Sequence, residues 1–147
     1  MKTWKFTALG SQDNGDDDLT PGMKNAISNR IPFTETMRDT FFKKLLKSVK
    51  QLQKKHTKIV VAQTYIKEKY RMLFLQEFKD IQFILVEADT KLRELRLSQR
   101  TSYPLDIEYA RTMCLNFEKP HIEYVSINND MDGEWSIIKQ LQKIIAK

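Results

Sequence analysis

The sequence is poor in residues that cross-link or interrupt a chain: one cysteine, four glycines and four prolines among 147 residues. With Cys114 alone the chain cannot form an internal disulfide or a cysteine-based metal cluster. This pattern is typical of a reducing compartment, and we expect a cytoplasmic protein. The scarcity of glycine and proline predicts that most of the chain is helix or strand.

Long apolar runs are also missing. No stretch approaches the roughly 18 apolar residues that span a bilayer, and the first residues have no leader of the secretory kind. We therefore expect no membrane partner. The two histidines, His56 and His121, lie far apart and lack companions of the right type, so no metal site is predicted.

Positive charge is in excess, at a formal +6. Seven lysines between positions 43 and 58 alternate with apolar residues at helical spacing, which is typical of the wet side of an amphipathic helix. Aromatic residues are not interleaved with them as in base-stacking surfaces, so a nucleic-acid partner is not favoured. An anionic small molecule, a sugar acid or a phosphate, explains a basic protein equally well. A homodimer is compatible with the sequence.

Short apolar, β-branched runs alternate with helical patterns. The runs at 58–62, 81–86 and 122–127 predict buried strands, and residues 4–9 predict a further one. The predicted helices span residues 36–55, 66–78, 90–100, 106–117 and 133–146. The alternation predicts one α/β domain over residues 1–147, with three layers and a mostly parallel sheet. We place the strand at 4–9 between the first two of the other strands.

Ligands of parallel α/β sheets bind beyond the carboxyl ends of the strands. Lys67 and Arg71 follow the strand at 58–62 and, being four residues apart, share one face of the first helical turns. Two cations beside a helix N-terminus favour the binding of an anion there. Three consecutive carboxylates at 16–18 occupy another loop. Either they lie in a solvated loop that caps a helix, or two of them form a carboxylate pair that holds a substrate hydroxyl.

Five segments, in order, resemble motifs of the gluconate kinases, small P-loop phosphotransferases related to shikimate kinase. They are GDDDLTP at 15–21, IPFTETMR at 31–38, AQTYIKEKYR at 62–71, RLSQR at 96–100 with Tyr103 and Pro104 after it, and FEKP at 117–120. The resemblance covers roughly residues 15–147. In that family the last two segments bound a mobile lid, here at about 96–120.

The resemblance implies an enzyme that uses ATP and Mg²⁺ to phosphorylate a sugar-acid hydroxyl. Asp17 would orient or deprotonate that hydroxyl. The guanidinium groups of Arg38 and Arg71 would hold the substrate carboxylate. That of Arg100, in the lid, would reach phosphate oxygens. The implied substrate-binding residues are Asp17, Asp18, Arg38, Lys67 and Arg71, and the implied phosphate and lid residues are Arg96 and Arg100.

One hallmark of that family is missing from these residues. The phosphate-binding loop G-x-x-x-x-G-K-[ST] occurs nowhere in the 147 residues. Only sixteen residues precede Asp17, too few for the strand, loop, helix and second strand of the family. The loop-like residues 10–15 include no lysine. We therefore expect a P-loop-kinase-like fold that is N-terminally truncated or degenerate, with no cofactor bound by this chain alone.

Three functions remain compatible with the sequence. The first is a degenerate kinase-like domain that keeps a sugar-acid or phosphate pocket without phosphotransfer. The second is part of an active ATP-dependent kinase whose P-loop segment is missing from this chain. The third is a basic α/β adaptor whose helix at 36–55 binds acidic partners.

Overall fold

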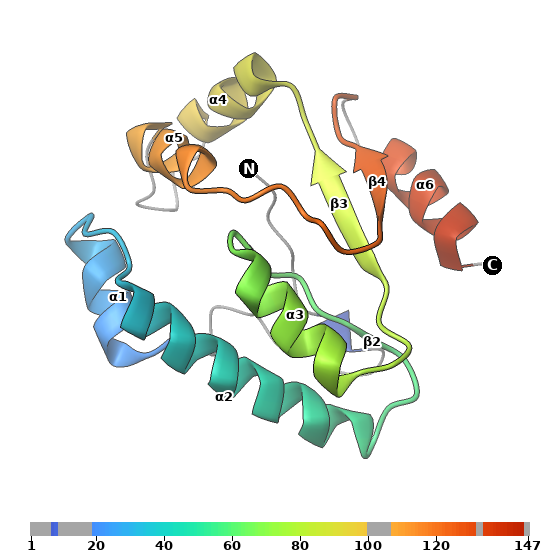
Figure 1. The fold of residues 1–147 in the computed structure, drawn as a ribbon. Coiled ribbons are helices and arrows are strands. Elements are labelled where there is room, and N and C mark those ends of the chain that lie inside the picture. Colours follow the sequence, from blue (N-terminus) through green and yellow to red (C-terminus); the bar gives the residue numbers. More distant parts are fainter. Residues whose placement is uncertain (1–6, 9–18, 100–106, 132–133, 146–147) are drawn as a thin grey trace. The chain divides into compact units, whose positions relative to one another are not determined.

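The computed structural model of the protein describes residues 7–8, 19–99, 107–131 and 134–145. Contacts along the chain divide it into two compact units, Thr3–Tyr65 and Ile66–Lys147, the second including Met1–Lys2. Each unit combines helices with one two-stranded sheet (Figure 1). Among the described residues, no helix has the length and apolarity needed to cross a membrane.

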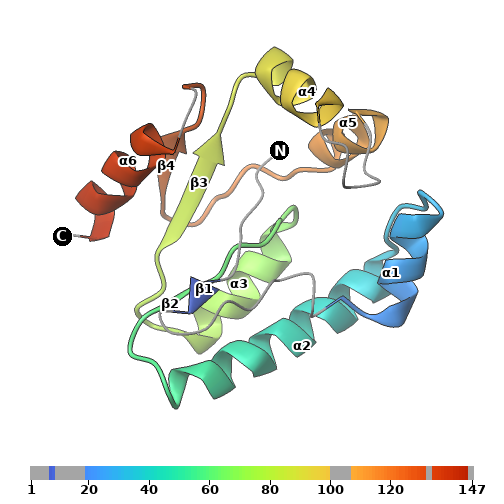
Figure 2. The same ribbon diagram turned by 180° about the vertical axis from the view of Figure 1, so that it is seen from behind.

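The N-terminal unit holds two helices and an antiparallel pair of very short strands. The helices are α1 (Pro21–Ser28) and α2 (Glu35–Gln53), and the strands are β1 (Thr7–Ala8) and β2 (Ile59–Val60). Strand β1 lies beside β2 (Figure 2). Thr7 lies opposite Val60 and Ala8 opposite Ile59. The two helices therefore account for more than half of the described residues of this unit.

Helix α1 was not predicted, although its ends carry recognisable signals. The Thr20 side chain accepts a hydrogen bond from the backbone N–H of Met23 at 3.2 Å, and Pro21 opens the helix, where its missing N–H costs nothing. The helix closes in a Schellman-type turn: the N–H of Ile31 donates to the carbonyl of Ala26 at 2.8 Å. Arg30 takes the left-handed position of that turn, with φ of 56°.

Helix α2 follows the predicted amphipathic pattern. Thr34 caps it by accepting from the backbone N–H of Met37 at 3.2 Å. The buried residues of the helix are Phe41, Phe42, Leu45 and Val49. The ring of Phe42 also packs against that of Tyr65, with 5.1 Å between centroids. Each such side chain contributes roughly 1.5–3 kcal/mol on burial, so this apolar side holds the unit together.

The C-terminal unit is built around a parallel strand pair. Its elements are α3 (Glu68–Glu77), β3 (Phe83–Glu87), α4 (Thr90–Ser98), α5 (Ile107–Leu115), β4 (Tyr124–Asn128) and α6 (Trp135–Ile145). The register runs from Phe83 opposite Tyr124 to Glu87 opposite Asn128. Helix α6 lies beside β4, and α4 lies beside α5 (Figure 1). The carboxyl ends of β3 and β4 therefore meet at one edge, as parallel pairing requires.

A side chain completes the outer edge of β4. The Gln140 amide of α6 accepts from the backbone N–H of Asn128 at 2.9 Å and donates to the carbonyl of the same residue at 2.8 Å. The next residue, Asn129, instead donates its N–H to the carbonyl of Glu87 at the end of β3. Alternate residues thus satisfy opposite edges of the strand.

The predicted mixture of helices with a parallel sheet is confirmed for β3 and β4, but the placement of the strand at 4–9 was wrong. Its described residues, Thr7 and Ala8, pair antiparallel with β2 alone and do not lie between two strands. The described strands make one parallel and one antiparallel pair rather than one mostly parallel sheet. An apolar run predicts a strand but carries no information on its partner or direction.

Candidate functional site

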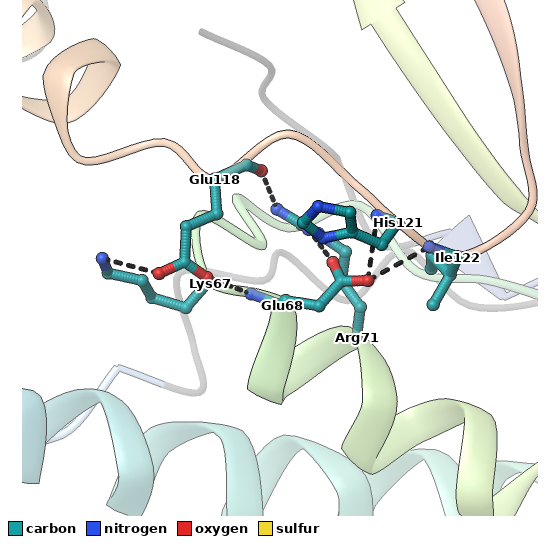
Figure 3. Close-up of polar contacts among 6 residues, drawn as sticks. All are labelled: Lys67, Glu68, Arg71, Glu118, His121 and Ile122. Carbon is teal, nitrogen blue, oxygen red and sulfur yellow. Dashed lines mark hydrogen bonds and ion pairs between the residues drawn. The ribbon is translucent and has the colours of Figure 1, made fainter.

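Helix α3 begins without a side-chain cap from its own sequence. Its N-cap residue is Lys67, whose ammonium group has no acceptor atom, and no side-chain hydrogen bond caps the helix locally. A carboxylate from far along the chain takes that place. Glu118 accepts from the backbone N–H of Glu68 at 2.7 Å and from Nζ of Lys67 at 3.0 Å (Figure 3).

Arg71 is a buried charge at the centre of this arrangement, with 3% of its surface exposed. Its guanidinium forms an ion pair with the carboxylate of Glu68 one turn earlier. It also donates to the backbone carbonyl of Glu118 at 2.5 Å and lies over the ring of Phe117, 5.4 Å from the centroid. A buried guanidinium needs such compensation, because an unpaired charge is costly away from water.

Glu68 joins the first turn of α3 to the segment that precedes β4. Besides Arg71, its carboxylate accepts from the backbone N–H groups of His121 at 3.0 Å and Ile122 at 3.1 Å (Figure 3). The backbone N–H of Glu118 in turn donates to the carbonyl of Ile66 at 2.8 Å. We call Lys67, Glu68, Arg71 and Glu118 the α3 clasp. It fixes where the chain enters β4.

The electrostatics of the clasp follow from its geometry. The N–H of Glu68 and then the Lys67 ammonium hold the pKa of Glu118 below its usual range. The side chains of Lys67 and Glu118 remain 37% and 45% exposed, so water reaches this pair. The sequence predicted that Lys67 and Arg71 attract an anion at a helix N-terminus. In the structure Lys67 holds the carboxylate of Glu118 and Arg71 holds that of Glu68, so both anions are the chain's own.

A second polar cluster lies beyond the carboxyl ends of β3 and β4. Asp89 caps α4 by accepting from the backbone N–H of Lys91 at 2.9 Å. Asp130 accepts from the N–H of Asp89 at 2.6 Å and from the side-chain amide of Asn128 at 2.6 Å. These bonds, that of Asn128 first, keep the pKa of Asp130 below its usual range. The described groups at this edge bind one another.

Arg96, a predicted phosphate-contacting residue, is tied to the same edge. Its guanidinium donates to the backbone carbonyls of Asn129 at 2.6 Å and Met131 at 3.2 Å. It therefore anchors α4 to the loop after β4. A contact with phosphate remains a prediction for this residue.

The other predicted site residues are distributed as follows. Arg38 lies in α2, half-buried, with its guanidinium 5.6 Å from the centroid of the Phe33 ring. It belongs to the N-terminal unit, and its convergence with Lys67 and Arg71 in one cleft remains a prediction. Asp17, Asp18 and Arg100 lie outside the described residues, as does the middle of the predicted lid, 100–106.

The resemblance implies ATP with Mg²⁺, whose phosphates such a fold holds in a glycine-rich loop. Within ranges 19–99, 107–131 and 134–145, no three His, Cys, Asp or Glu residues gather in a way that could hold a metal ion. The glycine-rich loop with its lysine and hydroxyl is missing from the printed sequence. Phosphoryl transfer needs both the cradle and the ion around the transferred group. No catalytic step can therefore be assigned to these residues.

Sequence reasoning missed the role of Glu68 and the capping role of Glu118. An acidic residue in the first turn of a helix is a usual partner for the helix dipole, and Glu68 occupies that position. That signal was available beside Lys67. Nothing local indicated that Glu118 would meet it, since 50 positions separate the two.

Comparisons with known proteins identify the fold. No protein-family model matches the chain, and no curated protein matches it by sequence. Two solved structures do match by shape, each with a TM-score of 0.72. One is an unliganded sugar kinase from Janibacter sp. HTCC2649, at 16% sequence identity over 89% of this chain and 77% of that one. The other is a gluconokinase from Sinorhizobium meliloti 1021, at 18% identity over 90% and 75%.

The chain has a kinase-like fold. At such low identity the likeness establishes the fold and leaves the activity open. It agrees with the order of the five sequence segments, which resembled gluconate kinases independently of any coordinates. The kinase-like fold itself is shown by the backbone shape.

Proposed function

We propose that this chain is a kinase-fold domain that binds a small anion, a sugar acid or a phosphate, without transferring phosphate itself. One combined observation carries the proposal. About nine-tenths of the chain superposes on sugar-kinase structures, while the printed residues contain no glycine-rich loop with its lysine. A fold retained without its phosphate cradle favours binding over phosphotransfer.

The ligand would be held by the residues that the resemblance implies: Asp17, Asp18, Arg38, Lys67 and Arg71, with Arg96 and Arg100 toward a phosphate. Within this set, Lys67 is the cation that can change partner. Its ammonium group and the Glu118 carboxylate that it holds are both partly exposed. The carboxylate of a ligand can therefore take the place of the Glu118 carboxylate. Arg71 is buried and paired with Glu68, so of these two cations Lys67 is the more accessible to a ligand.

Isothermal titration with D-gluconate and with inorganic phosphate tests the binding. Saturable heat is expected with at least one of them and none with neutral D-glucose, because the proposed contacts are to negative charge. Arg38→Gln should weaken the binding several-fold, whereas Lys24→Gln, at an exposed position of α1, should not. Failure of both anions to bind would refute the proposal.

A coupled assay tests the missing phosphotransfer. Purified protein with ATP, Mg²⁺ and gluconate is expected to show no turnover. Turnover that Asp17→Asn abolishes would mean that this chain is itself a kinase.

A second candidate is that the chain is one part of an active kinase. The two similar kinases extend beyond the matched region, since about a quarter of each is not covered. Supplying a glycine-rich segment, fused or as a separate polypeptide, distinguishes this candidate from the proposed binding domain. Activity that appears only then would favour this candidate.

A further inference from the structure

The excess positive charge of the protein is gathered in one segment. Residues 40–66 contain seven lysines and no Asp or Glu. Without these seven, the chain has 18 Lys and Arg against 19 Asp and Glu. The remainder is close to neutral, so the positive charge belongs to a particular surface rather than to the protein as a whole.

That surface begins on the side of α2 away from its buried residues and continues past the end of the helix at Gln53. All seven side chains are exposed, namely Lys43, Lys44, Lys47, Lys50, Lys54, Lys55 and Lys58. Four of them recur at intervals of four, three and four residues and so follow one line along the helix. We call Lys43, Lys47, Lys50 and Lys54 the lysine row. At the helical rise per residue, the row is roughly 16 Å long.

We propose that the lysine row binds the phosphate backbone of a nucleic acid. A strand of a duplex carries one negative charge about every 3.4 Å along the axis, so roughly 16 Å of it presents about five phosphates. Four lysines in line match that density. All basic residues of 40–66 are Lys and none is Arg. Lys binds phosphate as a point charge, without the bidentate geometry of Arg.

The composition of this face argues against an acidic protein as the partner. Protein interfaces are enriched in Tyr, Trp and Arg and depleted in Lys. The exposed residues of 40–58 other than the lysines are Thr and Gln alone. The face thus offers charge without the aromatic or Arg anchors on which protein partners depend.

A membrane surface is disfavoured by the same helix. Stable membrane attachment requires a second signal besides a basic patch, such as inserted apolar residues or an acyl chain. The apolar side of α2, from Phe41 to Val49, is buried in the protein's own core. None of the exposed residues of 40–58 is aromatic, so this face has no platform for stacking bases. Contact with the phosphate backbone of a nucleic acid does not require aromatic residues.

The test is fluorescence anisotropy with a labelled 20-base-pair DNA duplex and the matching RNA duplex, between 50 and 200 mM NaCl. Four phosphate contacts predict a slope of log affinity against log salt of about −3.6, which is a loss on the order of 100-fold over this range. Replacing the whole row by Gln should weaken binding at least ten-fold at 50 mM and remove most of the slope. Each single Lys→Gln change should reduce the slope by about 0.9.

The matched control removes the same charge elsewhere. It replaces four exposed lysines of the other unit by Gln: Lys79, Lys119, Lys139 and Lys143. This variant should bind like the wild type, and circular dichroism should show both variants folded. Equal losses in both variants would overturn the proposal by showing a net-charge effect. Absence of binding at 50 mM, or preference for vesicles with 30% phosphatidylserine over the duplexes, would also overturn it.

Discussion

The carboxylate of Glu118 accepts a hydrogen bond from the backbone N–H of Glu68 at 2.7 Å, across 50 positions of the sequence. It does for α3 what a neighbouring Ser or Asp does for most helices. Because the same carboxylate also holds Lys67, the start of α3 and the segment leading to β4 are ordered together. The α3 clasp is therefore a stability element as well as the candidate anion site.

Glu118→Ala should lower the free energy of unfolding by about 1 kcal/mol, the usual scale for losing a helix cap. Glu123→Ala is the matched control, since Glu123 is exposed on the same segment. Urea unfolding followed by circular dichroism measures both. Equal effects of the two substitutions would show that Glu118 does not cap α3.

Arg71→Leu should cost about 3 kcal/mol, because it leaves the Glu68 carboxylate without its buried partner. The double variant Glu68→Gln/Arg71→Leu should cost less than the single one, since no unpaired charge then remains. Arg111→Leu, which breaks an exposed ion pair with Glu94, should cost much less than Arg71→Leu, because water screens an exposed pair. Thermal and urea unfolding give the comparison. A double variant less stable than Arg71→Leu would contradict this account.

The stability should fall in acid through Glu118 and Asp130. Both pKa values are lowered in the folded protein, so the unfolded chain binds more protons as pH drops. Their contribution is complete above the ordinary carboxyl range and is lost as pH falls through the lowered values. The free energy of unfolding should be flat from about pH 5 to 7 and decline below about pH 4.5.

The control for this acid sensitivity is the variant Glu118→Ala/Asp130→Asn. It should be less stable at pH 7 but lose less on acidification than the wild type. Urea midpoints between pH 3 and 7 provide the measurement. An unchanged slope would assign the acid sensitivity to other carboxylates.

Arg30→Gly should raise the free energy of unfolding by about 0.5–1 kcal/mol. Arg30 has φ of 56° after α1, where a side chain is strained and glycine is not. The gain is reduced by the greater freedom of glycine in the unfolded chain. Arg30→Ala keeps the strain and should bring no gain. A stabilisation by alanine equal to that by glycine would mean that the Arg30 side chain, not the backbone, is unfavourable.

The helices were largely predictable because their signals are local. The prediction of 36–55 for α2 is close to the observed Glu35–Gln53, whose N-cap Thr34 is a residue type typical of a helix start. Helix α1 was missed because its proline and glycine were taken as loop residues, although Thr20 and Pro21 form a standard helix start. The strands were located to within two or three residues, but β1 was given the wrong partners.

The candidate site was predictable only in part, for the same physical reason. Adjacent cations at 67 and 71 indicated an attraction for anions, and the structure brings them together. The carboxylate that meets Lys67, that of Glu118, comes from a distant segment, and sequence spacing carries no information on such a pairing. Arg71 was expected to meet a ligand, yet its burial and its bond to Glu68 follow from the folded chain alone.

The Gln140 amide has a consequence for how the protein behaves at high concentration. By accepting from and donating to Asn128, it imitates the peptide group of a neighbouring strand. An exposed strand edge is a template on which other chains can add in register. A strand that approached β4 at this end would have to displace a side chain already bound to both backbone groups. Gln140 thus protects this edge of β4 against pairing with another chain. Leucine at position 140 would leave both backbone groups of Asn128 available for self-association.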